Sequence, residues 1–371
     1  MSKILILTNS AEGLYLFRKE LLCALKSDGH NLLVSVPPDK YCEKIEKLGC
    51  KVCVTHFERR GMNPLKDIQL IRKYLSFLHK EIPNIVLSYT IKPNIYGGLA
   101  CQLNRVPYIC NITGLGTALE NQSILSKVLL ICYKYSMKKA KCIFFQNESN
   151  RKFMNEHGIA CGNYRMLPGS GVNLTEHPYM EYPSEEDGIK FLAVMRIMRD
   201  KGIEEYLKAA QYIKEKYPKV SFYLAGDYEE ETREQYEMMI KILEEQGIIH
   251  YLGHIDNVHE RMAKCHVIVH PSYHEGLSNV LLEAAACGRP VLASDISGCI
   301  ETFLERESGF AFAVKSANAL ITAIEKILEL SYEERRNMGI AGRAWVEKNY
   351  DRTIIIEAYR EIINYIDTDR R

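Results

Sequence analysis

The sequence predicts an α/β fold made of two Rossmann-like domains that face each other across a cleft. Short apolar segments alternate with amphipathic ones along most of the chain, an order typical of parallel sheets covered by helices. The alternation stops near residue 167 and starts again near residue 189. The chain has 371 residues, which is more than a single domain of roughly 150 residues needs.

The first domain is expected over residues 1–172. An apolar run predicts its first strand at 3–8, and an amphipathic helix follows at 14–26 and ends at Gly29. The same patterns predict, in order, a strand at 31–36, a helix at 41–48, a strand at 52–56, a helix at 65–79, a strand at 85–88, a helix at 94–104, a strand at 108–112, a helix at 123–140 and a strand at 142–146.

The second domain is expected over residues 173–352. Turn residues between 167 and 188, among them Pro178 and Pro183, predict a hinge before it. Its strands are predicted at 189–195, 221–225, 250–252, 266–270 and 290–293, and its helices at 203–216, 230–246, 258–264 and 278–287. The amphipathic tail predicts a helix at 353–366, and we expect the segment 353–371 to cross back to the first domain.

Composition places the chain among ordinary cytoplasmic proteins. Hydrophobic residues make up 47% and charged residues 26%, which excludes a disordered or collagen-like chain. The apolar run near the start, at 4–7, predicts neither a secretory signal nor a membrane span. Twelve cysteines scattered through apolar segments indicate reduced thiols. Only Cys50 and Cys53 form a Cys-x-x-Cys pair, with no second pair at zinc-finger spacing, so no metal site is predicted.

Charge is distributed unevenly between the two halves. Residues 1–172 carry 24 Lys and Arg against 12 Asp and Glu, whereas the other residues carry 24 against 35. A basic half favours an anionic partner. Within it, the predicted helix 123–140 carries Lys127, Lys134 and Lys138 as one stripe and turns Leu125, Val128, Leu129 and Cys132 the other way. We expect this domain to bind an anionic membrane surface.

Familiar phosphate-binding motifs are missing. No G-x-G-x-x-G follows a strand, and no G-x-x-x-x-G-K-[ST] occurs, so neither a nicotinamide site nor a P-loop is predicted. The first strand–helix turn offers one glycine, Gly13, which we assign to ligand binding.

A phosphate site is instead predicted in the second domain. Arg196 and Lys201 follow its first strand, and a helix opens near Ser278 after the strand at 266–270. The amides at a helix start bind phosphate, and two nearby cations add countercharge. We therefore predict a diphosphate site from the two cations and the segment Gly276, Leu277, Ser278 and Asn279.

Two carboxylates flank this site. Glu275 precedes the helix and Glu283 lies inside it, eight residues later, so they point in different directions. A carboxylate is a poor partner for phosphate but a good acceptor for sugar hydroxyls. A ligand with a sugar at one end, a diphosphate in the middle and a ribose fits, and this describes a nucleotide sugar.

The combination resembles the family 4 retaining glycosyltransferases of the GT-B fold. The resemblance lies in Arg196-x4-Lys201, in Glu275-x7-Glu283 within 271–284 and in Cys287-Gly-Arg-Pro-Val291. Segment 167–173 resembles the family's interdomain segment. The first-half segments 59–64, 89–97 and 112–117 are similar to the bacterial subgroup that extends undecaprenyl-diphosphate-linked sugars for capsule, O-antigen or glycoprotein glycans.

The resemblance implies a role for each of these residues. Arg196 and Lys201 would hold the donor diphosphate, Glu283 the nucleotide ribose and Glu275 the transferred sugar, with base contacts near Tyr251 to His254. It also implies a hexosyltransferase that uses a UDP-sugar, retains the anomeric configuration and needs no metal or other cofactor. The acceptor would be a lipid-diphosphate-linked saccharide at the inner face of the cell membrane.

The first domain departs from the family pattern. Many relatives carry a histidine in a cleft loop where this chain has Thr90-Ile-Lys-Pro-Asn94, so no histidine is assigned as acid or base. Lys92, Asn94 and Thr113 are the weaker candidates for acceptor contacts.

Other functions fit the same pattern. A nucleotide-sugar epimerase of the same fold would use the same phosphate site without a second substrate. A non-catalytic scaffold of a polysaccharide assembly complex would keep the fold and tolerate loss of Glu275. Nucleic acid is not an expected partner because no reader motif accompanies the basic half. The oligomeric state, the transferred sugar and the linkage stay open.

Overall fold

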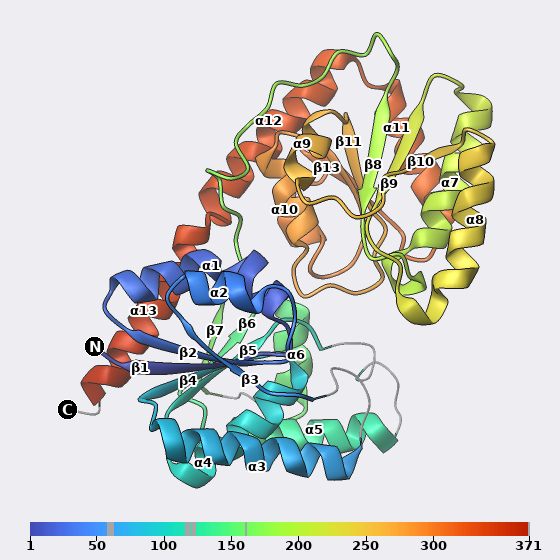
Figure 1. Ribbon diagram of the computed structural model, residues 1–371. Helices are drawn as coiled ribbons and strands as arrows, with labels where there is room; N and C mark the ends of the chain where they lie inside the picture. The colour runs from blue at the N-terminus through green and yellow to red at the C-terminus, as the bar shows by residue number, and fades with distance from the viewer. Residues whose placement is uncertain (58–62, 116–118, 120–123, 160–161, 370–371) are drawn as a thin grey trace. The chain divides into compact units, whose positions relative to one another are not determined.

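The computed structural model describes residues 1–57, 63–115, 119, 124–159 and 162–369. The chain divides into two compact units. Unit 1 comprises Met1–Gly171 and Arg352–Arg371, and unit 2 comprises Val172–Asp351. The sequence placed these boundaries one residue later. Figure 1 shows a sheet flanked by helices in each unit.

Unit 1 is built on a parallel sheet of seven strands in the order β3-β2-β1-β4-β5-β6-β7. The chain thus winds outward from β1 in one direction and then, from β4, in the other, which is the doubly wound topology. Most of these strands are buried and read as apolar runs, as expected for a sheet covered on both faces. The strands are β1 (Lys3–Leu7), β2 (Asn31–Val36), β3 (Lys51–Val54), β4 (Ile85–Tyr89), β5 (Tyr108–Ile112), β6 (Cys142–Phe145) and β7 (Tyr164–Met166).

Helices cover both faces of this sheet (Figure 1). One face packs in a single core with α1 (Ala11–Ser27), α2 (Cys42–Lys47) and α13 (Arg352–Asp369). The C-terminal helix therefore returns to the first unit, as the sequence predicted. The second core holds α3 (Pro64–Glu81), the π-helical turn η1 (Pro93–Gly97), α4 (Gly98–Asn104), α5 (Ile124–Met137) and α6 (Glu148–Glu156).

Unit 2 repeats this architecture with six parallel strands in the order β10-β9-β8-β11-β12-β13. Its strands are β8 (Lys190–Val194), β9 (Ser221–Ala225), β10 (Ile249–Tyr251), β11 (Val267–His270), β12 (Val291–Ser294) and β13 (Gly309–Phe312). Its helices are η3 (Arg199–Lys201), α7 (Ile203–Lys216), η4 (Glu230–Thr232), α8 (Arg233–Glu245), α9 (Val258–Ala263), α10 (Asn279–Ala286), η5 (Ile300–Thr302), α11 (Ala317–Glu329) and α12 (Tyr332–Asn349).

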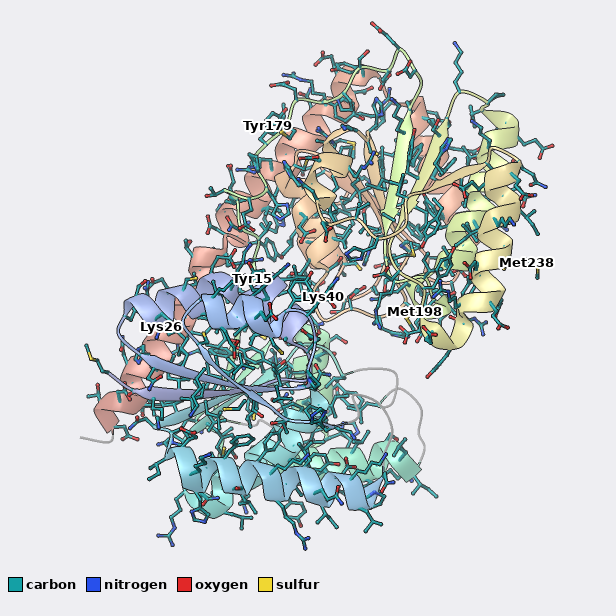
Figure 2. All side chains as sticks on the ribbon, in the orientation of Figure 1. Tyr15, Lys26, Lys40, Tyr179, Met198 and Met238 are labelled. Carbon is teal, nitrogen blue, oxygen red and sulfur yellow. The ribbon has the colours of Figure 1, made fainter. Side chains whose placement is uncertain are left out.

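Arg289 fastens the irregular segment before β8 to unit 2. Its side chain is fully buried, and its guanidinium donates to the backbone carbonyls of Met180 and Glu181 as well as to those of Met262 and Ala263. These bonds satisfy several donors of a buried cation. Tyr179, labelled in Figure 2, lies in the fastened segment.

Helix α5 departs from the sequence prediction. It buries Leu129 but exposes Leu125 and Val128, which the predicted helix turned away from the lysine stripe. The apolar face of this helix is wider than the core requires, so part of it faces solvent beside Lys127 and Lys134. Of the four apolar residues predicted opposite the lysines, Leu125 and Val128 are therefore exposed, whereas Leu129 is buried.

Several elements were not predicted. The sequence pattern gave no sign of β7, β13, α6, α11 and α12, and it indicated a continuous helix from residue 94 where η1 precedes α4. Of the family motifs, residues 59–62 and 116–117 lie outside the part of the chain that the structure describes, as does Cys161.

Candidate active site

The predicted site residues of unit 2 gather where the strand order reverses. Strands β8 and β11 are neighbours in the sheet, and the chain leaves them toward opposite edges. Ligands of open α/β sheets bind at the carboxyl ends of two such strands. Lys201 comes from the loop after β8, and Glu275 comes from the loop after β11. Met198, labelled in Figure 2, lies in the first of these loops.

Backbone contacts hold these two loops together. Gly202 has a φ of 74°, and a Cβ atom placed there would lie 2.1 Å from the carbonyl oxygen of Pro271. Only glycine fits this approach. The N–H of Tyr273 also donates to the carbonyl of Asp200 at 2.9 Å. Lys201 lies between Asp200 and Gly202 in the sequence, so these two contacts place it beside the loop after β11.

Lys201, Glu275 and His270 form one network at this point. The Nζ atom of Lys201 lies 2.5 Å from Oε1 of Glu275, and the side chains are 20% and 15% exposed. Nε2 of His270 lies 3.0 Å from the same carboxylate oxygen and 3.1 Å from Oγ of Ser278. Lys201 also donates to Oγ of Ser272 at 3.4 Å. The carboxylate therefore lies between a cation and a ring N–H.

The network keeps Glu275 ionised. Burial raises the pKa of its carboxyl group, but the hydrogen bond from His270 and the charge of Lys201 outweigh burial and hold that pKa well below its ordinary value. Because an ionised carboxylate only accepts hydrogen bonds, Nε2 of His270 carries the proton. Glu275 is therefore a fixed hydrogen-bond acceptor.

The start of α10 lies beside this network. Ser278 is its N-cap, and Oγ of Ser278 accepts from the N–H of Leu281. The N–H of Ser278 donates to the carbonyl of Gly298 at 2.8 Å, which ties the helix start to the loop after β12. Gly276 and Leu277 are buried just before the helix, whereas Asn279 and Glu283 are half-buried. A helix start combined with Lys201 is an arrangement that binds phosphate.

Arg196 and His254 make other contacts in this structure. Nη1 of Arg196 donates to Oε2 of Glu229 at 2.9 Å, and the arginine side chain is 58% exposed. Nδ1 of His254 lies 2.8 Å from Oδ2 of Asp227. Both residues follow strands of the same sheet at their carboxyl ends. Their contact with a ligand stays a prediction.

The candidate residues of unit 1 are engaged within that unit. The N–H of Gly13 donates to Oγ of Ser10, the N-cap of α1. Asn94 is 1% exposed, and its amide joins Ser88 to the backbone of Asn111.

These contacts give Gly13 and Asn94 roles inside the domain. Nζ of Lys92 lies 2.9 Å from Oδ1 of Asp67, and Thr113 is half-buried after β5. Ligand contacts of all four residues stay predictions.

Acidic side chains are possible metal ligands, but two aspartates of α13 make contacts within unit 1 instead. Among the described side chains, no cluster of three or more His, Cys, Asp or Glu residues is suited to a metal ion. The sequence does contain an Asp-x-Asp triplet, Asp367 to Asp369, in α13. Oγ of Ser2 donates to the first aspartate, and Lys141 pairs with the second. These contacts fasten α13 within unit 1.

Two family models match the chain. Residues 180–345 match the family described as "Glycosyl transferases group 1", and residues 3–147 match "Glycosyl transferase 4-like". Together the two matches cover most of units 1 and 2. The chain belongs to the group 1 glycosyltransferases. The loop carrying Glu275 and helix α10 lie within the first match.

Curated relatives of this glycosyltransferase include enzymes named for lipid-linked acceptors. The N,N'-diacetylbacillosaminyl-diphospho-undecaprenol alpha-1,3-N-acetylgalactosaminyltransferase of Campylobacter jejuni is 29% identical, over 98% of this chain and 99% of that protein. The UDP-Gal:alpha-D-GlcNAc-diphosphoundecaprenol alpha-1,3-galactosyltransferase of Escherichia coli is 25% identical, over 76% of this chain and 77% of that protein.

A solved structure shares the fold of this glycosyltransferase. HepE of Anabaena, in complex with UDP-glucose, superposes with a TM-score of 0.81 at 18% identity and covers 98% of this chain and all of that one. The similarity supports the GT-B fold that the sequence resemblance implied.

Sequence reasoning missed two residues that shape the site. His270 ends the buried strand β11, immediately before Pro271, and Gly202 follows Lys201. A histidine at the carboxyl end of an otherwise apolar strand was the available signal for the first. The second was visible only as a glycine next to a predicted phosphate ligand, and its close approach to Pro271 depends on tertiary structure.

Proposed function

We propose that this glycosyltransferase moves a hexose or N-acetylhexosamine from a UDP-sugar to a saccharide linked to a lipid diphosphate, during assembly of a bacterial surface polysaccharide or glycan. The names of the Campylobacter and Escherichia relatives support the lipid-linked acceptor. The UDP complexes of the Anabaena neighbour support the donor. In this proposal unit 2 binds the donor and unit 1 binds the acceptor.

One observation carries the proposal. At the switch point of unit 2, Lys201 lies against Glu275 beside the N-cap of α10. Lys201 and the amides at the helix start neutralise the diphosphate as it leaves, and Glu275 accepts hydroxyls of the transferred sugar. Arg196 would swing from Glu229 to the diphosphate, and Glu283 would bind the ribose. Lys201, Arg196 and the amides at the helix start stabilise the negative charge of the diphosphate in place of a divalent cation. The transferred sugar retains its anomeric configuration.

Turnover with a panel of UDP-sugars tests this proposal. With a lipid-diphosphate-linked saccharide as acceptor, one UDP-sugar should give a longer saccharide with the same anomeric configuration, in EDTA as well as in Mg²⁺. Glu275→Ala should abolish transfer while the protein still folds. Conversion of the donor to its epimer without acceptor would favour the epimerase. Full activity of Glu275→Ala in polysaccharide assembly would favour the scaffold.

We also propose that unit 1 associates with the inner face of the cell membrane through α5. No helix in the described part of the chain has the length and apolarity needed to cross a bilayer. On α5, however, Ile124, Val128, Ile131 and Tyr135 are exposed, at spacings of four, three and four residues that keep them on one side. Lys127 and Lys134 on this helix, and Lys138 just after its end, are also exposed. Exposed apolar residues flanked by lysines are typical of helices that lie in an anionic interface.

Sedimentation with vesicles tests the membrane proposal. Binding to phosphatidylglycerol vesicles should weaken when Lys134 and Lys138 are changed to Glu, and it should weaken with salt. Ile131→Ser should weaken binding at high salt as well, because it removes apolar contact. Lys152→Glu, an exposed change on α6, is the matched control. Equal binding of all variants would refute the assignment to α5.

A further inference from the structure

A second basic site lies in unit 1, at the carboxyl ends of strands β2, β3 and β4. A pocket of about 410 Å³ opens there. It is lined by the residues that follow these strands, among them Pro37, Phe57 and Lys92, and by the first three turns of α3. This end of the sheet is where doubly wound domains bind ligands. The proposed donor site lies in unit 2 and does not use the pocket, whereas Lys92, a candidate acceptor contact from the sequence, lies in its wall.

The lining is cationic. It contains Lys66, Lys73 and Lys92, with Asp67 as its single carboxylate among the described lining residues. Asp67 lies 2.9 Å from Lys92, and these side chains are only 10% and 12% exposed. Among the described lining residues, three lysines therefore stand against one carboxylate. Such a pocket attracts an anion with more than one charge.

The lysines on α3 are placed by helix geometry. Lys66, Leu70 and Lys73 lie four and three residues apart, so they share one face of the helix, and this face lines the pocket. Nζ of Lys73 also donates to the backbone carbonyl of His56 at 3.0 Å, which directs it toward the end of β3. Asn63 caps the helix, and its side chain accepts from the N–H groups of Leu65 and Lys66.

Apolar side chains complete the pocket. Pro37, Pro38, Phe57 and Leu70 line it together with the charged groups. A ligand that joins a polyanion to an apolar chain matches both parts of the lining. A sugar nucleotide does not, because its diphosphate is flanked by polar groups on both sides.

The pocket and helix α5 belong to the same side of unit 1. Helices α3 and α5 and the turn η1 pack in one core on the same face of the sheet, and η1 contacts both helices. A lipid-linked ligand anchored in a bilayer under α5 would therefore have its polar head close to the pocket.

We infer that this pocket binds the diphosphate of the lipid-linked acceptor, an inference that rests on the proposed function. Lys73 and Lys66 contact the phosphate oxygens, and Lys92, held by Asp67, contributes from the other wall. The apolar walls receive the first carbons of the lipid. The saccharide beyond the diphosphate then projects away from the pocket as the group to be extended.

Calorimetry with inorganic pyrophosphate tests the pocket directly. Saturating UDP is included so that the donor site is occupied. Wild-type protein should bind pyrophosphate, and Lys73→Glu and Lys66→Glu should weaken binding at least tenfold. Arg72→Glu is the control, because it makes the same change in charge at a neighbouring α3 position outside the lining. Lys73→Arg should retain binding. Equal binding by Lys73→Glu and Arg72→Glu would overturn the inference.

Steady-state kinetics separates this inference from the proposed function. Lys73→Glu should raise KM for the lipid-linked acceptor at least tenfold, with KM for the donor and acceptor-independent release of UDP within twofold of wild type. An unchanged acceptor KM would overturn the acceptor site alone. Absence of UDP release and of transfer in the wild type would instead refute the proposed function, and pyrophosphate binding would still report on the pocket.

Vesicle binding distinguishes a diphosphate from a phospholipid headgroup. Lys66→Glu and Lys73→Glu should sediment with phosphatidylglycerol vesicles to the same extent as Arg72→Glu, because α5 makes that contact. A selective loss of vesicle binding in the two pocket variants, with acceptor KM unchanged, would assign the pocket to phospholipid headgroups and overturn the inference.

Discussion

Nζ of Lys201 lies 2.5 Å from Oε1 of Glu275, although the two residues are 74 positions apart in the sequence. Both side chains are mostly buried, so the pair is shielded from salt more than a surface pair would be. The contact joins the loop after β8 to the loop after β11. It places a cation and an anion at the point where the proposed donor carries both a diphosphate and a sugar.

Lys201→Met should lower turnover about a hundredfold or more, the usual effect of removing one group that stabilises developing charge. Glu275→Gln should lower turnover by a similar factor, because a neutral amide is a weaker acceptor for the sugar. Steady-state rates of the single and double variants give the coupling between them. Lys216→Met removes the exposed pair of Lys216 with Glu325 in the same unit and serves as the control. Near-normal turnover of Lys201→Met would refute the assigned site.

Gly202→Ala should reduce activity at least tenfold, because the new Cβ atom would lie 2.1 Å from the carbonyl of Pro271 and must push the two loops apart. Gly247 supplies a matched control. Its φ is 69°, close to that of Gly202, but nothing lies within 4 Å of the place that a Cβ atom would take. Gly247→Ala should therefore cost only the backbone strain of about 1 kcal/mol and keep full activity. Rates and unfolding temperatures of both variants check this, and equal losses would mean that the loop contact is unimportant.

His270→Leu should shift the acidic limb of the kcat/KM profile to higher pH. The variant removes a hydrogen bond that lowers the pKa of Glu275, whereas burial, which raises this pKa, is unchanged. The carboxylate of the variant therefore takes up a proton at higher pH. The fraction of ionised Glu275 then falls at a pH where the wild type is fully active. Profiles between pH 4 and 8 measure the shift. His250→Leu changes an exposed histidine of β10 and should leave the profile in place; an unmoved acidic limb in His270→Leu would contradict the network.

Much of the fold was predictable because apolar strands and amphipathic helices alternate in order. The proximity of Lys201 and Glu275 was predictable because each follows a buried strand, and parallel strands end at a common edge. The ion pair of Arg196 with Glu229 was not predictable, since Glu229 comes from a separate loop. The contacts of Asn94 within the domain were not predictable either, and its ligand contact stays a prediction. A polar residue after a strand can face a ligand or, as here, bond to Ser88 and Asn111 within the domain.

Glu229→Gln should tighten UDP binding about two- to fivefold, on the scale of a largely exposed ion pair. In the structure Glu229 holds the guanidinium of Arg196, and a diphosphate must compete with it. Removing the negative charge lowers that competition. Titration calorimetry with UDP measures the change, and Glu237→Gln, which removes a partner of Arg233 on α8, is the control. Weaker UDP binding by Glu229→Gln would show that the pair itself shapes the donor site.

Unit 2 should lose stability as the pH falls from about 6.5 to about 4, because burial lowers the pKa of His266 to about 4. Nδ1 of His266 accepts from the N–H of Lys190, and Nε2 donates to the carbonyl of Ser184, so the folded state holds the neutral ring. Unfolding in this range takes up a proton, which lowers the free energy of unfolding by up to about 3 kcal/mol at the acidic end.

The single tryptophan, Trp345, lies in unit 2, so its fluorescence reports urea unfolding of that unit. His266→Gln should be less stable at pH 7 and lose less between pH 6.5 and 4, whereas His250→Gln should follow the wild type. Equal slopes for wild type and His266→Gln would assign the acid sensitivity to other groups.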